Sequence, residues 1–400
     1  MKKTVQFKNL KNCMDALVSD PQRPSVDIMV CRNHQTLFRY FTGVKDIEKN
    51  NAVTGDEFYF IYSMTKMLTC ACALQLLEKG KYRLDDKLCD YLPEFAKMKI
   101  GADEINPENA ANIASGKSIG EQVDIEGNGY AKTPITIRHL FTMTAGLDYS
   151  IFCDEFKNAI AAGKSPTREL VRAISEKTLG FEPGTHFRYS LCHDVLGALV
   201  EVWSGEKFGD YMKKNILDPL GMKNTFFGLP EDTEKMPALY SRYQGCPFTK
   251  EPMRCVYTLT EQYQSGGAGL TSTTQDYAMF LDAVACGGVG KSGNRILKED
   301  TIKLWKTNQL RGAAAEDFSN MRPGYGYGLG VRTHINPEIS QSHSPIGEFG
   351  WDGAAGAFAM VDTDNKISLT YFQNVLGYAP YHTAIRNALY KDLEIYKNEP

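Results

Sequence analysis

Strand-like patterns occur near both ends of this 400-residue chain, whereas helical patterns fill the part between them. β-Branched and aromatic residues gather in the strand-like stretches, which are residues 26–30, 36–42, 325–333, 355–362 and 366–374. Apolar residues recur at helical spacing in the others, which are residues 67–77, 167–174, 194–203, 276–284 and 381–396. Terminal strands bury their apolar faces most simply by pairing with each other. We therefore predict one sheet assembled from both chain ends, carrying a helical insertion, and hence an α/β (α+β) fold class.

One polar stretch interrupts the helical part. Residues 106–132 are rich in Asn, Gly, Ser and acidic residues and contain few apolar ones. Such a composition is typical of exposed loops, so we predict an exposed insertion there.

Composition and charge exclude several classes of function. The formal net charge is −3 and no block of Lys and Arg occurs, so we expect no nucleic-acid partner. No run of 18 apolar residues is present, so we expect no membrane span. The ten cysteines are scattered and no apolar signal segment follows the start, which predicts reduced thiols in a cytoplasmic protein. The histidines and cysteines show no metal-ligand spacing, so we predict neither metal nor cofactor; the oligomeric state stays open.

The strongest chemical motif is Ser63-Met64-Thr65-Lys66, at the start of an apolar helix. A spacing of three on a helix puts both side chains on one face, about 5–6 Å apart at Cβ. Serine is a weak nucleophile unless a base takes its proton, and a buried lysine can be that base because burial disfavours the ammonium form. The helix N-terminus also directs N–H groups towards a developing oxyanion.

The tetrapeptide alone does not identify a nucleophile, because chance copies are expected in a chain of this length. Ser204-Gly205-Glu206-Lys207 matches the same pattern. That copy contains a helix-breaking glycine and follows a helix end, so it lacks a strand-to-helix setting. The competing interpretation of Ser63 is a helix N-cap beside an unrelated lysine.

Two further elements fit a nucleophilic site. Tyr189-Ser190-Leu191 lies between a turn signal and an apolar helix, where a tyrosine can shuttle a proton or act as a phenolate. The glycine-rich stretch at residues 350–356 leads into a strand and could supply a second oxyanion N–H group. Each has a plain alternative, because Tyr-Ser recurs in the chain and glycines also form tight turns.

A Ser-His-Asp triad is the competing mechanism. Gly116-Lys117-Ser118-Ile119-Gly120 matches the Gly-x-Ser-x-Gly motif, but it lies in the polar insertion, with no strand before it and no apolar helix after it. We therefore favour Ser63.

In order and setting, these elements resemble the class C β-lactamase and penicillin-binding-protein superfamily and, within it, the family VIII carboxylesterases. The further stretches that carry this resemblance are residues 136–146, 181–185, 218–222, 265–270 and 325–330. The resemblance implies a β-lactamase-like fold with an antiparallel sheet flanked by helices and a mainly helical domain. It places the sheet domain at residues 1–62 and 322–400 and the helical domain at residues 63–321, with the active site between them.

The resemblance also implies roles for single residues. Ser63 would be the acylated nucleophile, Lys66 its proton acceptor, and Tyr189 a partner in proton transfer. Because such close groups titrate together, the choice between Lys66 and Tyr189 as main base stays open. The backbone N–H groups of Ser63 and Ala354 would form the oxyanion hole.

Two departures from the β-lactamase pattern point to esters. Leu191 stands where β-lactamases carry an asparagine, and Trp351-Asp352-Gly353 stands where they usually carry Lys-Thr-Gly. The amide and the lysine that hold an acylamino or carboxylate group are therefore missing. We also expect Asp352 to disfavour anionic substrates. The expected substrate-binding residues are Trp351, Asp352, Gly353, Leu191, Tyr149 and His343, and Arg332 is a further candidate.

The predicted function is hydrolysis of small or short-chain carboxylic esters through a Ser63 acyl-enzyme, with weak or no β-lactamase activity. The same site would also suit an acyltransferase, an amide hydrolase or a D-amino-acid peptidase. A catalytically silent binding protein of the same fold is the alternative from another class.

Overall fold

The computed structural model describes residues 6–101, 129–377 and 381–394. The predicted insertion at residues 106–132 therefore lies outside the described residues except for its last four. None of the helices in these ranges has both the length and the apolar character that a bilayer crossing requires.

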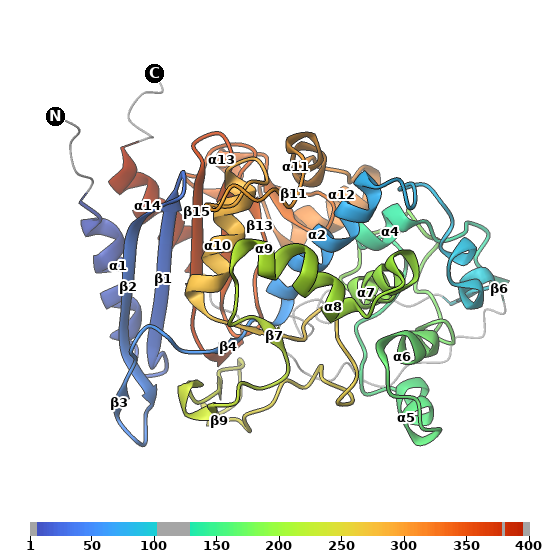
Figure 1. The fold of residues 1–400 in the computed structure, drawn as a ribbon, viewed down its shortest axis with the longest axis horizontal. Coiled ribbons are helices and arrows are strands. Elements are labelled where there is room, and N and C mark those ends of the chain that lie inside the picture. The colour runs from blue at the N-terminus through green and yellow to red at the C-terminus, as the bar shows by residue number, and fades with distance from the viewer. Residues whose placement is uncertain (1–5, 102–128, 378–380, 395–400) are drawn as a thin grey trace.

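An eight-stranded antiparallel sheet forms one side of the molecule (Figure 1). Its strands, in spatial order, are β11 (Tyr325–Tyr327), β12 (Arg332–His334), β13 (Phe349–Gly350), β14 (Phe358–Asp362), β15 (Ile367–Phe372), β1 (Ser25–Arg32), β2 (Gln35–Asp46) and β3 (Asn51–Ala52). The N-terminal β1 pairs with the C-terminal β15 from Asp27 opposite Phe372 to Arg32 opposite Ile367. The predicted sheet built from both chain ends, and with it the fold class, is confirmed.

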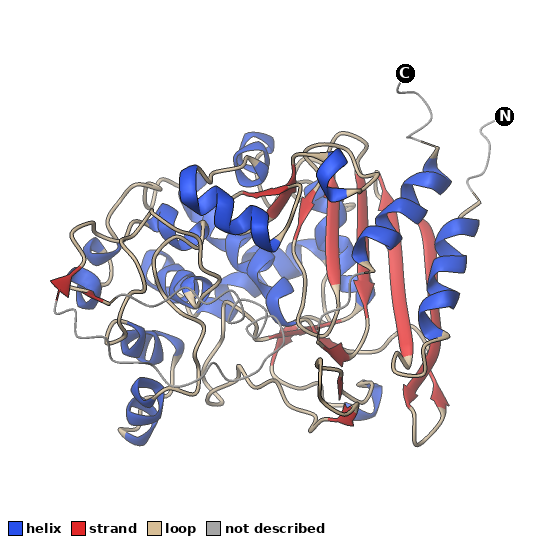
Figure 2. Ribbon diagram, turned by 180° about the vertical axis from the view of Figure 1, so that it is seen from behind, coloured by secondary structure: helices blue, strands red, loops and turns tan. Residues whose placement is uncertain are grey.

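Helices cover both faces of this sheet. On one face lie α1 (Lys8–Val18) and α14 (His382–Leu393), which Figure 2 shows crossing the strands side by side. Leu10 and Leu389 from these helices share an apolar cluster with Val26 and Ile28 of β1. The other face packs against α10 (Thr274–Ala285). Because both faces are covered, β1 is buried almost throughout and lacks the alternation of a half-exposed strand.

The remaining helices form the second part of the molecule around the buried α2 (Thr65–Glu78). They are α4 (Ile137–Phe141), α5 (Asp154–Ala161), α6 (Thr167–Ile174), α7 (Cys192–Ser204), α8 (Phe208–Met212), α9 (Asp218–Leu220), α11 (Glu299–Lys306) and α12 (Gly312–Met321). The short α13 (Pro337–Ser340) lies at one end of the sheet. The division into two domains stays a prediction, and α10 packs on the sheet although it belongs to the segment assigned to the helical domain.

Two small three-stranded sheets and one strand pair complete the described fold. They are β4 (Tyr59–Phe60), β10 (Leu270–Ser272) and β7 (Phe226–Phe227) in one small sheet, β16 (Val375–Leu376), β8 (Tyr240–Ser241) and β9 (Thr249–Lys250) in another, and the pair β5 (Lys99–Ile100) and β6 (Gly129–Tyr130). The first of these sheets leads directly into α2.

Two sequence expectations differ from the structure. The single strand predicted over residues 325–333 is a hairpin of β11 and β12, because the chain turns at Gly330, whose φ is +89°. A Cβ at Gly330 would lie 2.4 Å from the Cys70 sulfur, so only glycine fits this turn. Helix α1 was not predicted, although Leu10, Met14 and Leu17 recur at spacings of four and three.

Candidate active site

Ser63 lies on a short 3₁₀ turn, Tyr62–Met64, between β4 and α2. The residue before it, Tyr62, has a φ of +44°, a left-handed conformation that is rare for a bulky residue. Packing enforces this turn, because the Ile61 N–H donates to the Leu270 carbonyl at 3.1 Å and the Tyr277 hydroxyl donates to the Met64 carbonyl at 2.8 Å. Strained residues of this kind are frequent beside reacting groups.

Lys66 is fully buried on the first turn of α2. Its Nζ donates to Ser63 Oγ at 3.2 Å, to the Tyr149 hydroxyl at 3.0 Å and to the Gly267 carbonyl at 2.7 Å. Burial lowers the pKa of Lys66 to about 7, an effect that the nearby Asp194 carboxylate partly offsets. A substantial fraction of this lysine is therefore neutral near pH 7 and able to accept the Ser63 proton.

A buried carboxylate fixes the loop that supplies the Gly267 carbonyl. Asp194, in the first turn of α7, accepts hydrogen bonds from Tyr263 at 2.8 Å and from Ser265 at 2.6 Å. A Cβ at Gly267 would lie 2.6 Å from Asp194 Oδ2 and 3.1 Å from the Tyr149 hydroxyl, so the backbone passes between these groups only as glycine. The sequence showed Ser265-Gly266-Gly267 as a family-like stretch but gave no sign of its link to Lys66.

Two tyrosines enclose the lysine. The rings of Tyr149 and Tyr189 stack with centroids 5.2 Å apart and planes 3° apart, and the Lys66 ammonium lies 5.0 and 4.6 Å from their centroids. Burial raises the pKa of both phenols well above its usual value, and hydrogen bonding to Ser63 offsets this only in part. Both are therefore neutral phenols near pH 7, which favours proton relay over the phenolate role.

Trp351 fixes the second tyrosine. Its indole Nε1 donates to the Tyr189 hydroxyl at 3.1 Å, and the two rings stack with centroids 5.6 Å apart. A phenol that accepts this bond keeps its own proton free to donate towards the nucleophile or a leaving group. The structure therefore brings together Ser63, Lys66, Tyr149, Tyr189 and Trp351.

The chain around Ala354 lies against the turn that carries Ser63. A Cβ at Gly353 would lie 2.6 Å from the Ile61 carbonyl oxygen, so glycine permits this contact. The Gly353 N–H donates to the Ala357 carbonyl at 2.7 Å, which closes a tight turn. Within the described ranges, the Ala354 N–H donates to no protein acceptor and is thus available to a ligand.

Asp352 lies among charged and polar side chains from other segments of the chain. It is mostly buried and forms ion pairs with Arg322 at 3.0 Å and with Arg332 at 3.7 Å, and His382 Nδ1 lies 3.7 Å from its carboxylate. Although burial opposes its charge, the two arginines and the contact with His382 hold the pKa of Asp352 well below its usual value. Arg322 and Arg332 therefore compensate the negative charge of Asp352 within the protein, and the expected effect of that charge on anionic substrates stays a prediction.

Three other sequence candidates contribute no polar side-chain group to the reacting cluster. Two of them make their contacts elsewhere, and the third has an apolar side chain. Arg332 is buried and donates to Glu348 at 2.8 Å and to the Ala359 carbonyl at 3.0 Å, so it is committed to the sheet. His343 follows α13 in the chain, and its backbone N–H donates to Asn387 of α14 at 2.7 Å. Leu191 is buried just before α7 and contributes only apolar surface.

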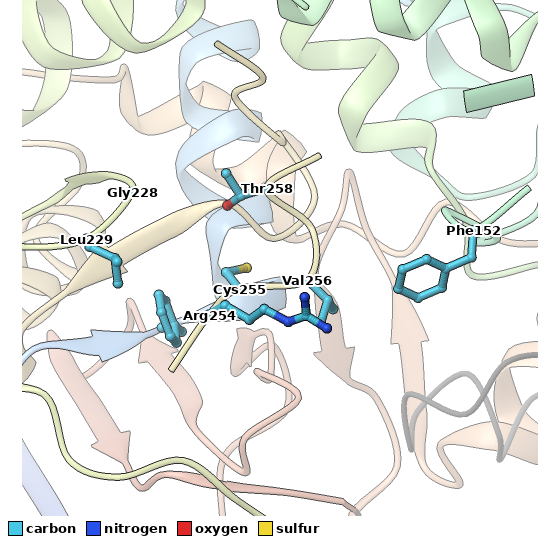
Figure 3. A pocket seen from close by; sticks show the side chains of 8 residues that line it. Phe152, Gly228, Leu229, Arg254, Cys255, Val256 and Thr258 are labelled. Atoms are coloured by element: carbon cyan, nitrogen blue, oxygen red, sulfur yellow. The ribbon is translucent and has the colours of Figure 1, made fainter. Parts of the chain in front are cut away.

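An apolar pocket lies beside β4, the strand that precedes Ser63, and Figure 3 shows the side chains that line it. Its volume is about 280 Å³, and it is lined by Phe60, Phe152, Gly228, Leu229, Arg254, Cys255, Val256 and Thr258. Tyr257, between two of these residues, packs edge-on against Tyr62 and Tyr149, with centroids 6.3 and 5.5 Å apart. The loop that forms the pocket therefore also borders the reacting groups, a link that the sequence analysis missed.

Comparison with known proteins identifies the fold and the family of this chain. The fold is that of β-lactamases and penicillin-binding proteins, as in the solved structure of EstCE1, "a hydrolase with promiscuous acyltransferase activity", with a TM-score of 0.76, 22% identity, and coverage of 96% of this chain and 98% of that one. The family described as Beta-lactamase matches residues 10–391, and the chain belongs to that family.

Two relatives with similar sequences are an esterase and an acyltransferase. Esterase EstB of Burkholderia gladioli is 24% identical over 397 residues, covering 90% of this chain and 89% of that protein. The acyltransferase calJ of Penicillium decumbens is 28% identical over 360 residues, covering 83% and 79%. These matches confirm the resemblance to the family VIII carboxylesterases predicted from the sequence.

Proposed function

We propose that this protein is a serine hydrolase that cleaves carboxylic esters through an acyl-enzyme on Ser63. The observation that carries the proposal is the fully buried Lys66, whose Nζ lies 3.2 Å from Ser63 Oγ and whose pKa burial lowers to about 7. Lysine in such a setting serves as a base rather than as a surface charge. The esterases among the relatives support the same class of reaction.

In acylation, Ser63 Oγ attacks the ester carbonyl carbon while its proton passes to neutral Lys66. The N–H groups of Ser63 and Ala354 donate to the oxyanion that forms. When the carbon–oxygen bond to the alcohol breaks, the proton returns to the leaving oxygen through the Tyr149 and Tyr189 phenols. Water then attacks the acyl-enzyme by the reverse route, releasing the acid and restoring Ser63.

The surroundings of the site favour small neutral esters. Leu191 and Trp351 offer no amide or ammonium group for an acylamino or carboxylate substituent, and the adjacent pocket is mainly apolar. An acyl or alkyl group gains about 25 cal/mol for each Å² of apolar surface that it buries there. We therefore expect β-lactam hydrolysis to be slow or absent.

Transfer of the acyl group to an alcohol is the second candidate reaction. The relative calJ is an acyltransferase, and EstCE1 is described as having promiscuous acyltransferase activity. The same acyl-enzyme serves both outcomes, and the nucleophile that resolves it decides between them.

The test is the initial rate of p-nitrophenyl butyrate hydrolysis by the wild type, Ser63→Ala and Ser204→Ala. The last variant is a matched control, because Ser204 begins the second Ser-x-x-Lys match. We expect Ser63→Ala to lose at least about a thousandfold in kcat and Ser204→Ala to stay within about twofold. Equal rates for Ser63→Ala and the wild type would exclude the Ser63 acyl-enzyme.

A further inference from the structure

A His, an Asp and a Cys side chain, all of types that can ligate a metal ion, lie together away from Ser63, where α10 ends beside the turn between β1 and β2. His34 belongs to the turn, Asp282 to α10, and Cys286 directly follows that helix. Asp282 and Cys286 are four residues apart, which places them on one face of the helix end. Although 248 residues separate His34 from Asp282, the fold brings them into contact.

The donor atoms are close to the spacing that a metal ion imposes. One donor atom from each residue lies within 4.8 Å of the other two. His34 Nδ1 is 2.8 Å from Asp282 Oδ2, and Cys286 Sγ is 3.9 Å from Asp282 Oδ1. Tetrahedral zinc with bonds of 2.0–2.3 Å separates neighbouring ligand atoms by about 3.3–3.8 Å. Small side-chain rotations therefore suffice to admit an ion.

The backbone fixes two of the three groups before any ion binds. Asn33 and His34 have φ values of +48° and +66°, as in the tight turns that join hairpin strands. The His34 N–H donates to Asp282 Oδ1 at 3.0 Å, which anchors the turn to the helix. The Asp282 side chain is only 8% exposed, while His34 is 28% exposed and leaves a path for an ion from solvent.

The chemistry of the donor set selects the class of ion. One imidazole nitrogen, one carboxylate oxygen and one thiolate sulfur suit zinc and similar transition metals rather than calcium or magnesium. A carboxylate and a thiolate together balance the charge of a divalent ion. Cys31, buried on the face of β1 that packs against α10, interacts electrostatically with Asp282 and Cys286 and adds a second sulfur to the neighbourhood. The exposed Lys366 also lies within electrostatic reach of Cys286, but its side chain can extend into solvent.

We propose that His34, Asp282 and Cys286 form a binding site for a divalent transition-metal ion of the zinc class, with water as the fourth ligand. The ion binds neutral His34 at Nδ1, with the imidazole proton on Nε2, and replaces the Cys286 thiol proton, which is released to solvent. It ties the β1–β2 turn to the end of α10. Because this site lies outside the Ser63 cluster, it acts on stability rather than on ester hydrolysis. The sequence analysis predicted no metal, because the ligands come from segments too distant to form a spacing motif.

The test is a Co²⁺ titration of reduced, metal-stripped full-length protein, followed by absorption spectroscopy. We expect one equivalent to bind with a thiolate-to-cobalt charge-transfer band and the intense visible bands of tetrahedral Co²⁺. Zn²⁺ should displace it and raise the Tm of the wild type.

Two ligand variants and one control make the result specific. Cys286→Ser removes the sulfur, and His34→Asn removes the imidazole while keeping a residue that tolerates the left-handed turn. Each should weaken Co²⁺ binding at least about tenfold and abolish the Tm shift with Zn²⁺. Cys246→Ser, which removes an exposed thiol elsewhere, should bind like the wild type.

Absence of the charge-transfer band in the wild type, or wild-type affinity in both ligand variants, would overturn the proposal. Ester hydrolysis measured in parallel should stay within about twofold in all variants, which shows that they are folded. Because ester hydrolysis depends on the Ser63 cluster and not on the metal ligands, failure of the metal site and failure of the proposed hydrolase are distinguishable.

Discussion

The chain contains two copies of Ser-x-x-Lys, and the fold places them in different environments: the lysine of the first is buried, and that of the second is exposed. Lys66 is fully buried, and its Nζ lies 3.2 Å from Ser63 Oγ. Ser204 instead donates to the Val200 carbonyl at 2.6 Å, and Gly205, with φ of +75°, ends the helix between it and the exposed Lys207. The same four-residue pattern is thus a candidate catalytic pair in one place and a helix end in the other. Burial and enclosure, not spacing, distinguish the two.

The largest expected effect comes from removing each lysine. Lys66→Met keeps an unbranched side chain of similar length but removes the base, so kcat for ester hydrolysis should fall at least about a thousandfold. Lys207→Met should leave kcat within about twofold. Steady-state kinetics with p-nitrophenyl butyrate measures both kcat values. Similar losses in the two variants would contradict the claim that only the first Ser-x-x-Lys copy is catalytic.

The two enclosing tyrosines should differ from each other. Tyr189→Phe removes the hydroxyl that Trp351 holds, and kcat should fall about a hundredfold because proton relay to the leaving group is lost. Tyr149→Phe removes one acceptor of Lys66 and should cost about tenfold. Full activity of Tyr189→Phe would shift the relay role to Tyr149 and contradict the assignment taken from the family.

The pH profile tests the buried state of Lys66. Because burial lowers its pKa to about 7, the neutral base predominates above that pH and the ammonium form below it. We expect kcat/KM to rise about tenfold per pH unit below pH 7 and to level off above it. A rate that climbs steadily up to the usual pKa of lysine would show that Lys66 is not desolvated.

Trp351 should give the smallest change. Trp351→Phe keeps the aromatic packing but removes the indole N–H that donates to the Tyr189 hydroxyl. We expect kcat to fall about threefold to tenfold, with KM little changed, because a single neutral hydrogen bond contributes about 1 kcal/mol. A rise in KM alone would instead make Trp351 a substrate contact.

The spacing of apolar residues predicted those helices and strands whose form depends mainly on neighbouring residues in the sequence. The strands near residues 26 and 366 and the helices α2, α6 and α10 followed from hydrophobic periodicity. Helix α1 was missed because it presents only a narrow apolar stripe, and the β11–β12 hairpin was read as one strand because its turn depends on packing of Gly330 against Cys70.

The site was predictable in its motifs but not in its contacts. Ser63 and Lys66 are close in the sequence, so their meeting followed from helix spacing. The Gly267 carbonyl that accepts a hydrogen bond from Lys66 lies 201 residues further along the chain, and no sequence pattern predicted this contact. The orientation of the Asp352 carboxylate likewise depends on its contacts with Arg322 and His382, which belong to different segments of the chain.

Trapping the acyl-enzyme tests the central claim most directly. The wild-type protein would be mixed with p-nitrophenyl butyrate, quenched in acid within the first turnover, and analysed by intact mass and peptide mapping. We predict the added mass of one butyryl group, on the peptide that contains Ser63 and absent in Ser63→Ala. Two results would contradict the account. One is a butyryl group on the peptide that contains Ser204. The other is substrate turnover by both the wild type and Tyr189→Phe while neither protein carries a butyryl adduct.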